Sequence, residues 1–305
     1  MSEVDSVMLN FSPGSLMLLN GILAIVMFGV ALDLTLSDFR RLLDTPRALL
    51  LGFFSQFLFL PAATFLLVLA LRPAPSMALG MMLVAACPGG NISNFITHRA
   101  GGNTALSVSL TAVATVCATI MTPFNLAFWG SLYAPTLPLL TETSVSPFEM
   151  AWTVAILLVF PLIIGMTINA RFPAFSARIR GTMRVLSMVI FAGFVIGALA
   201  ANWQHFINYV SLVAGLVLLH NAIALGGGYG IAWAGGLTEY DRRAVSIETG
   251  IQNSGLGLIL IFNFFGGLGG MAIVAAWWGV WHILSGLALA AWFGRRPIST
   301  RGAAA

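Results

Sequence analysis

A single acidic residue, Glu248, stands inside a polar run that interrupts an apolar segment near the end of the chain. The run reads SIETGIQNSG and covers residues 246–255. A carboxylate at membrane depth costs several kcal/mol unless something pairs with it. The chain contains no Lys, and Arg242 and Arg243 lie at the edge of the apolar segment. The pattern therefore predicts that Glu248 pairs with a bound cation or a proton.

A second polar run interrupts the apolar segment 76–97 and reads CPGGNISN over residues 87–94. Pro removes a backbone donor and Gly-Gly frees the dihedrals, so the helix should break there. Two broken helices in corresponding halves of a membrane protein indicate a transporter binding site. The alternative is that these residues only kink packed helices. The amide, hydroxyl and carboxyl groups of both runs favour a site, because unsatisfied polar atoms cost free energy in apolar surroundings.

Hydroxyl groups follow one face of the segment 103–130. Ser107, Thr111 and Thr115 are spaced four residues apart and therefore share a helix face. They either bond to the carbonyls of their own helix or reach an ion. Gln56, a lone amide in an apolar segment, has two similar interpretations: it joins helices or contacts an ion.

The composition is that of a membrane protein: 59% of the residues are hydrophobic and 8% are charged. A soluble domain carries about 25% charged residues. Long apolar stretches, each able to cross about 30 Å of hydrocarbon, predict an all-α polytopic membrane protein without a separate soluble domain. Nine transmembrane helices are expected, at 15–36, 48–71, 76–97, 103–130, 151–170, 185–201, 209–235, 244–263 and 271–293.

The arginines predict the orientation. With nine spans, every one of the 14 basic residues except Arg72 falls on the same side. By the positive-inside rule that side is the cytoplasm, which places the N-terminus outside and the C-terminus inside.

The Arg-only basic set and the Ala- and Gly-rich composition indicate a bacterium, and hence the inner membrane. Because the basic residues lie at membrane edges, no nucleic-acid partner is expected. The acidic, polar first 13 residues do not form a signal peptide.

Both polar runs resemble the crossing helices of the bile acid:sodium symporter family. The run 87–94, with Gly102-Asn103 and the sequence ALSV at 105–108, resembles the first crossing helix, and the run 248–255 resembles the second. The pairs Trp281-His282 and Ser285-Gly286 match the last helix of the family. The resemblance extends from about residue 20 to residue 293 and identifies the chain as a bacterial sodium-dependent organic anion transporter.

The resemblance implies a fold and its division. An inverted repeat would relate the first half, 15–130, to the second half, 151–293, with one helix missing from the first. A core with two crossing discontinuous helices would comprise approximately 48–130 and 209–293. A panel that moves against this core would comprise 15–36 and 151–201.

The resemblance also implies two sodium ions behind the crossing and an organic anion beside it. Every protein ligand offered to the ions is a hard oxygen, which suits a small hard cation. The ligand set of the first ion would be Ser93, Asn94, Ser107, Thr111 and Glu248. The set of the second would be Gln56, Glu248, Gln252 and the backbone carbonyls of Thr249 and Ile251. The substrate contacts would be Gly90, Asn91, Asn253 and His282.

Family members that bind bile acid carry Asn where this chain has Ile283. The substrate pocket should therefore be more apolar at that point. A bile acid and a small carboxylate, such as pantoate or a 2-oxo acid, both stay open as substrates. For His282 the alternative to a substrate contact is a bond to a backbone carbonyl.

Three other functions are alternatives to a sodium symporter: a cation/proton antiporter, an intramembrane hydrolase and a receptor. A cation/proton antiporter shares the two broken helices, but it needs an acid that alternates between proton and sodium. An intramembrane hydrolase needs a nucleophile with a base or a metal, and the sequence shows neither a Gly-x-Ser-x-Gly elbow nor His/Glu metal spacing. A receptor would lack any attached signalling domain. The sequence thus predicts a sodium-coupled symporter and not an enzyme.

Overall fold

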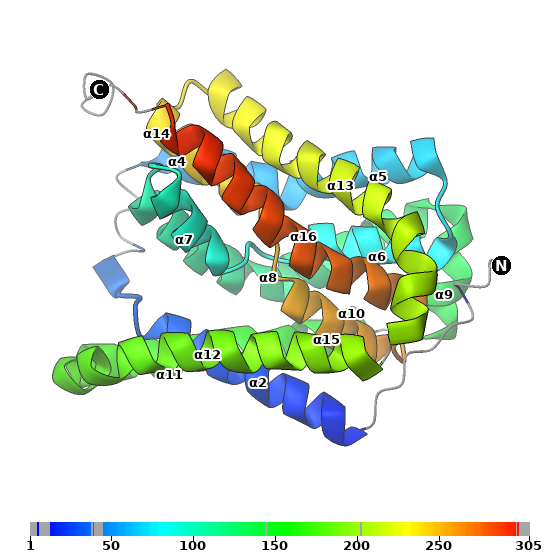
Figure 1. Ribbon diagram of the computed structural model, residues 1–305, viewed down its shortest axis with the longest axis horizontal. Coiled ribbons are helices and arrows are strands. Elements are labelled where there is room, and N and C mark those ends of the chain that lie inside the picture. Colours follow the sequence, from blue (N-terminus) through cyan, green and yellow to red (C-terminus); the bar gives the residue numbers. More distant parts are fainter. Residues whose placement is uncertain are drawn as a thin grey trace.

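The computed structural model describes residues 5, 13–37, 39, 45–143, 146–201, 203–296 and 298. Within these residues the regular structure is helical apart from one isolated bridge. The predicted all-α fold is confirmed (Figure 1). The elements are α2 (Pro13–Ala31), α4 (Pro46–Phe54), η1 (Ser55–Phe59), α5 (Leu60–Leu71), α6 (Pro75–Ala86), α7 (Ile92–Arg99), α8 (Thr104–Leu132), η2 (Ala134–Thr136), α9 (Leu137–Glu142), α10 (Pro147–Val154), η3 (Ala155–Val159), α11 (Phe160–Arg171), α12 (Pro173–Ala201), α13 (Trp203–Ala234), α14 (Glu239–Gly250), α15 (Ser254–Phe264) and α16 (Gly269–Gly294).

Over the described residues these elements form helical segments at the nine predicted places. The segment α4–η1–α5 is continuous, as is α10–η3–α11, whereas α6/α7 and α14/α15 are each interrupted. Helix α2 starts at one end of the molecule and α16 finishes at the other (Figure 1). In the part of the chain that the structure describes, five helices are long and apolar enough on their own to cross a membrane: Pro46–Leu71, Thr104–Leu132, Pro147–Arg171, Ile207–Ala234 and Gly269–Gly294.

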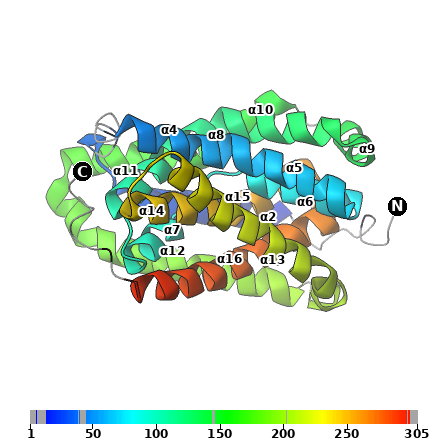
Figure 2. The ribbon, with the colours of Figure 1, turned by 90° about the horizontal axis from the view of Figure 1, so that it is seen from above.

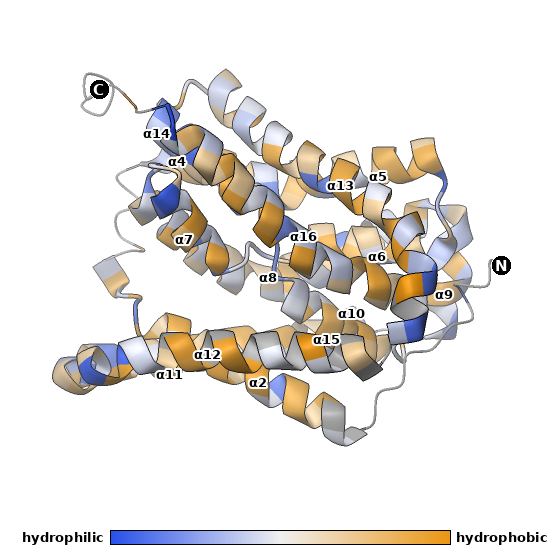
Figure 3. Cartoon of the chain, in the orientation of Figure 1, coloured by the Kyte–Doolittle hydropathy of each residue, from blue (hydrophilic) through white to orange (hydrophobic). Residues whose placement is uncertain are grey.

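Several helices are longer than their apolar patterns predict. Helix α12 begins at Pro173 instead of 185, and α14 begins at Glu239 instead of 244. Backbone hydrogen bonding continues into polar ends, which hydropathy does not mark. Figure 3 shows this directly, since hydrophilic residues gather at the start of α14 and at one end of α12. Of the arginines used for the orientation, Arg40, Arg41 and Arg301 lie outside the described residues.

The helices pack in two groups. Helix α2 packs mainly against α11 and α12, and these three lie together along one side of the molecule (Figure 1). Helices α6, α8, α13, α14 and α16 pack against one another on the other side, while α10 packs against α8 (Figure 2). At the end of the first group, Arg180 pairs with Asp33 at 3.2 Å, and Asn169 donates to the carbonyl of Leu34 at 3.0 Å.

Two prolines inside the long segments explain their local unwinding. One turn of π-helix, Ser55–Phe59, precedes Pro61, and a second, Ala155–Val159, precedes Pro161. Pro has no N–H, so the carbonyl four residues earlier loses its helical donor. The carbonyl of Phe57 instead accepts from the side-chain amide of Asn125 at 3.1 Å. This bond ties the segment that carries Gln56 to α8.

Both predicted helix breaks are present, and they meet. Helix α6 ends at Ala86 and α7 begins at Ile92, while α14 ends at Gly250 and α15 begins at Ser254. The extended residues between the halves pair antiparallel, with Gly89 opposite Gln252. The N–H of Gly90 donates to the carbonyl of Ile251 at 2.6 Å, and that of Asn253 donates to the carbonyl of Pro88 at 2.9 Å. Each break thereby satisfies backbone groups of the other, as membrane depth requires.

Candidate ion-binding and substrate-binding site

The carboxylate of Glu248 lies in the last turn of α14, beside the crossing of the broken helices. It is 3% exposed. One oxygen, Oε2, accepts from the hydroxyls of Ser93 at 2.6 Å and Ser107 at 3.3 Å. The other, Oε1, accepts from the hydroxyl of Thr111 at 2.8 Å. Three helices, α7, α8 and α14, therefore converge on one carboxylate.

Asn94 completes this group. Its side-chain oxygen accepts from Ser107 at 2.9 Å and from Thr111 at 3.3 Å. The structure thus brings together all five residues that the sequence assigned to the first ion. The hydroxyls on α8 differ in the groups that they reach. The hydroxyl of Thr111 lies within bonding distance of Glu248 and of a carbonyl of its own helix, whereas that of Thr115 bonds to the carbonyl of Thr111 at 2.7 Å.

Within the described part of the chain, no salt bridge involves Glu248, and the partners of Arg243 lie elsewhere. The hydroxyl protons can rotate, so the same oxygens that now point toward the carboxylate offer lone pairs to a cation beside it. Hydroxyl, amide and carboxylate oxygens are the ligands that hard cations prefer.

Of the residues assigned to the second ion, Gln56, Thr249 and Gln252 are joined to one another by hydrogen bonds. Gln56 donates to the side-chain oxygen of Gln252 at 2.9 Å, and Gln252 donates back to Gln56 at 3.1 Å. Gln252 also donates to the carbonyl of Thr249 at 2.7 Å. The carbonyl of Ile251 accepts from Gly90. A cation at this place would have to separate the two amides and accept their oxygens as ligands.

The four candidate substrate contacts lie around the crossing, and they differ in whether their polar groups already have hydrogen-bond partners. The N–H of Gly90 is occupied by the bond to Ile251, and a side chain there would meet the carbonyl of Gln252. Asn253 accepts from the N–H of Leu256 at 3.0 Å and so caps the start of α15. Asn91 reaches the sulfur of Met27 on α2 at 3.6 Å. Among the described residues, Nδ1 of His282 is buried and has no hydrogen-bond partner.

The contacts of three further residues near the site could not be predicted from the sequence. The hydroxyl of Ser55 lies 2.8 Å from that of Thr249, although adjacent residues such as Ser55 and Gln56 point in different directions on a regular helix. Asn221 donates to the carbonyl of Gly250 at 2.7 Å and thereby satisfies the end of α14. Arg243, placed by the sequence at a membrane edge, is buried with 3% exposure. No local pattern signals these contacts, because each joins distant segments.

Two interrupted helices that meet inside a helical membrane bundle, with a carboxylate buried at the meeting point, are the arrangement typical of ion-coupled transporters. Residues 21–209 match the model of the Sodium Bile acid symporter family. The chain belongs to this family, which confirms the resemblance seen in its motifs.

Three relatives illustrate the range of the family. An uncharacterized sodium-dependent transporter, YocS of Bacillus subtilis, is 31% identical over 274 residues, covering 90% of this chain and 82% of the relative. The probable sodium/metabolite cotransporter BASS1 of Arabidopsis thaliana, a chloroplast protein, is 33% identical over 80% of this chain and 59% of its own length. The ileal sodium/bile acid cotransporter of Cricetulus griseus is 29% identical over 77% of this chain and 66% of its own length. These relatives are named as transporters and not as enzymes, in agreement with the sequence prediction.

Proposed function

We propose that this protein is a sodium-coupled symporter that imports an organic anion across the bacterial inner membrane. Its N-terminus would lie outside and its C-terminus in the cytoplasm. The observation that carries the proposal is the convergence of hydroxyl and amide oxygens from α7 and α8 on the buried carboxylate of Glu248. A sodium ion at this place would neutralise the carboxylate, which removes the cost of keeping it at membrane depth.

Two sodium ions are proposed. The first would take oxygens from Ser93, Asn94, Ser107, Thr111 and Glu248. The second would replace the reciprocal amide bonds between Gln56 and Gln252 and share Glu248 with the first. Binding of the second ion would give the extended residues 251–253 a charged partner. Sodium binding would therefore order the crossing, and an ordered crossing would bind sodium more tightly.

The organic anion would bind on the face of the crossing where two half-helices begin. Helix α7 starts after Asn91 and α15 starts after Asn253. Helix N-termini carry a partial positive charge and unpaired N–H groups, which favour an anionic group. We propose a carboxylate or sulfate as the recognised group, with Asn91, Asn253 and His282 as side-chain contacts. The body of the substrate would be either a bile acid or a small carboxylate such as pantoate or a 2-oxo acid.

Movement would occur between the two groups of helices. We propose α2, α11 and α12 as the centre of a panel that rocks against the group containing α6, α8, α13, α14 and α16. The contact of Asn91 with Met27 of α2 joins the crossing to this panel. Two sodium ions carried with one monovalent anion would bring one net positive charge inward, a gain of about 2.3 kcal/mol per 100 mV.

The test of this function is thermal stabilisation of the purified protein in sodium and in potassium, against a panel of organic anions. A ligand that binds the folded state raises the melting temperature. We expect sodium alone to stabilise the protein, and one class of anion to add a further shift only in sodium. Equal stabilisation by an anion in potassium and in sodium, or no response to sodium at all, would contradict sodium symport. Stabilisation by sodium that depends on pH and that no anion increases would favour the cation/proton antiporter.

Removing one neutral ligand should weaken each sodium site without emptying it. For Asn94→Ala and Gln252→Ala, we expect the sodium concentration for half-maximal stabilisation to rise about tenfold, since a bond to a charged group contributes about 1.5 kcal/mol. Anion affinity at saturating sodium should change much less.

A matched control for this pair is Thr115→Ala, because the Thr115 hydroxyl is buried on α8, close in the chain to Thr111, but bonds to the carbonyl of Thr111 and not to Glu248. We expect its sodium dependence to equal that of the wild type. A change in anion preference alone, in the variants at 94 and 252, would show that the ion and substrate positions have been exchanged.

A further inference from the structure

Helix α7 carries two residues of the ion-binding group, Ser93 and Asn94, and is only 8 residues long. An isolated helix of this length is unstable, so its position depends on what holds its ends. Its first end is held by the bond between Gly90 and Ile251. Its other end, the carbonyl of Ala100, accepts from Nη1 of Arg243 at 2.8 Å.

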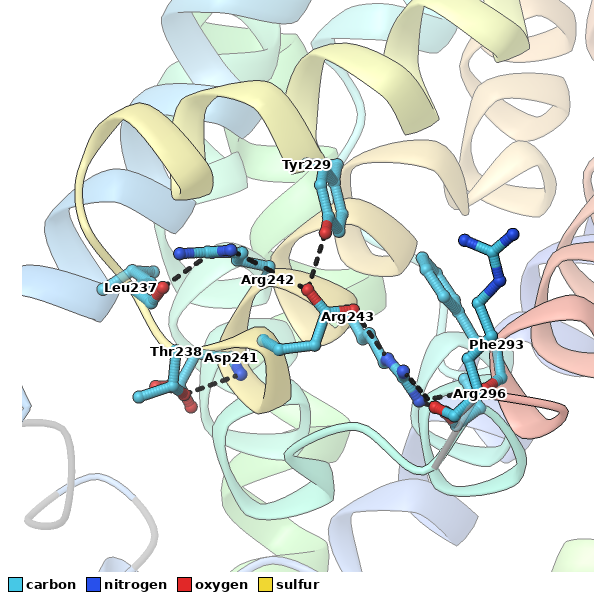
Figure 4. Close-up of polar contacts among 10 residues, drawn as sticks. Tyr229, Leu237, Thr238, Asp241, Arg242, Arg243, Phe293 and Arg296 are labelled. Atoms are coloured by element: carbon cyan, nitrogen blue, oxygen red, sulfur yellow. Dashed lines mark hydrogen bonds and ion pairs between the residues drawn. The ribbon is translucent and has the colours of Figure 1, made fainter. Parts of the chain in front are cut away.

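Arg243 is the centre of a polar cluster that joins several helix ends. Its Nε donates to Glu239 at 3.0 Å, its Nη1 also donates to the carbonyl of Phe293 at 3.2 Å, and its Nη2 donates to the carbonyl of Arg296 at 2.7 Å. The guanidinium carbon lies 4.8 Å from the centre of the Phe293 ring. Figure 4 shows the side chain reaching from α14 to the end of α16. We name this group the Arg243 clasp: Tyr229, Glu239, Arg243, Phe293, Arg296 and the carbonyl of Ala100.

Only arginine can make this set of contacts. The guanidinium has five N–H groups in a rigid planar fork, whereas a lysine ammonium has three donors at one point. Its positive charge also faces the carbonyl ends of α7 and α16, where helix dipoles favour a cation. Because only 3% of the surface of Arg243 is exposed, water could not solvate its charge if these partners were lost.

The clasp is connected to the ion-binding group through the helices that carry both. Arg243 precedes Glu248 by five residues of the same helix, a rise of about 7.5 Å. The hydroxyl of Tyr229 on α13 donates to Glu239 at 2.6 Å and steadies the acidic partner of Arg243 (Figure 4). Next to the clasp, Asn103 donates its backbone N–H to the carbonyl of Tyr240 at 2.9 Å and its side-chain amide to Asp241 at 2.7 Å. Asn103 is the N-cap of α8, which carries Ser107 and Thr111.

All three helices that supply oxygens around Glu248 are thus held to one another where α14 begins. We propose that Arg243 is a positioning residue for sodium binding: it sets the distance of α7 and α8 from α14, and through that distance the sodium affinity. This inference rests on the proposed function of the Glu248 group. Supporting residues behind metal ligands typically change metal affinity by about 10- to 100-fold when replaced.

The test is a sodium titration of the melting temperature of the purified protein, for wild type, Arg243→Lys and Arg180→Lys. We expect Arg243→Lys to raise the sodium concentration for half-maximal stabilisation about tenfold. Arg180→Lys is the matched control, because Arg180 also forms an ion pair, with Asp33 at 3.2 Å, but lies in α12, in the other group of helices and outside the clasp. Its sodium midpoint should equal that of the wild type.

A merely structural role for Arg243 has a different signature. It would lower the melting temperature of Arg243→Lys in potassium while leaving the sodium midpoint unchanged, and this result would overturn the inference. Glu239→Gln, which keeps an oxygen acceptor for Arg243 but removes its charge, carries the test if Arg243→Lys does not fold. We expect a shift of its midpoint in the same direction, about threefold, and an unchanged midpoint would overturn the inference. A wild type without any sodium response would overturn the proposed function as well, so the two failures are distinguishable.

Discussion

Glu248→Gln should reduce anion uptake in sodium to the level measured in potassium. The substitution keeps the size of the side chain and one oxygen acceptor, but it removes the charge around which Ser93, Ser107 and Thr111 are arranged. The remaining neutral oxygens would hold a sodium ion much less tightly at this depth, because the opposite charge that offsets part of its dehydration is gone. The measurement is uptake of the anion identified by thermal stabilisation, in proteoliposomes with a sodium or a potassium gradient.

The control is Glu149→Gln. Glu149 is exposed at the first turn of α10, far in the chain from the crossing, and its neutralisation should leave uptake unchanged. Retention of normal sodium-coupled uptake by Glu248→Gln, with Glu149→Gln also normal, would show that the carboxylate does not hold the ion.

Gly89→Ala should have the second largest effect, through a steric conflict with the same carboxylate. A Cβ atom at Gly89 would overlap the carboxylate of Glu248. Either the carboxylate must leave its hydroxyl partners or the paired backbone at Gly89 and Gln252 must separate. Overpacking of this kind typically costs about 1–3 kcal/mol. We expect a lower melting temperature together with loss of the sodium response.

Two further variants make this prediction specific. Gly257→Ala adds a methyl group at a buried glycine of α15 where the nearest atom, the sulfur of Cys87, lies 3.8 Å from the new Cβ, so it should be tolerated. In the Glu248→Ala background the partner of the clash is absent, and Gly89→Ala should then cost much less than it costs in wild type. Equal costs in both backgrounds would show that the two residues do not interact.

Much of the fold could be predicted from the sequence, because the relevant signals are local. The long apolar stretches specify membrane helices, and Pro88 with Gly89 and Gly90 specifies a break through the chemistry of those residues themselves. The polar run around Glu248 indicates its own importance, since a carboxylate is costly in an apolar segment. The helix ends were less well predicted, as α12 and α14 show, because polar turns continue a helix without an apolar pattern.

The composition of the first proposed ion-binding group was predicted through resemblance to a family, and the structure brings its five residues together around Glu248. The hydroxyl spacing on α8 indicated a shared face, but it could not tell Thr111, which reaches Glu248, from Thr115, which bonds to its own helix. That difference depends on how far along α8 the carboxylate of α14 lies. The depth at which two helices meet is a property of their packing.

By itself the sequence determined the membrane class, the two breaks and the acid that needs a partner, since each follows from the solvation and backbone chemistry of neighbouring residues. Only the tertiary structure decided that Gly89 lies opposite Gln252, that three helices converge on Glu248, and that Arg243 is buried among helix ends. These contacts join residues that are mostly far apart in the chain. They form because buried polar groups must find partners, and which partners are within reach is settled only when the helices have packed.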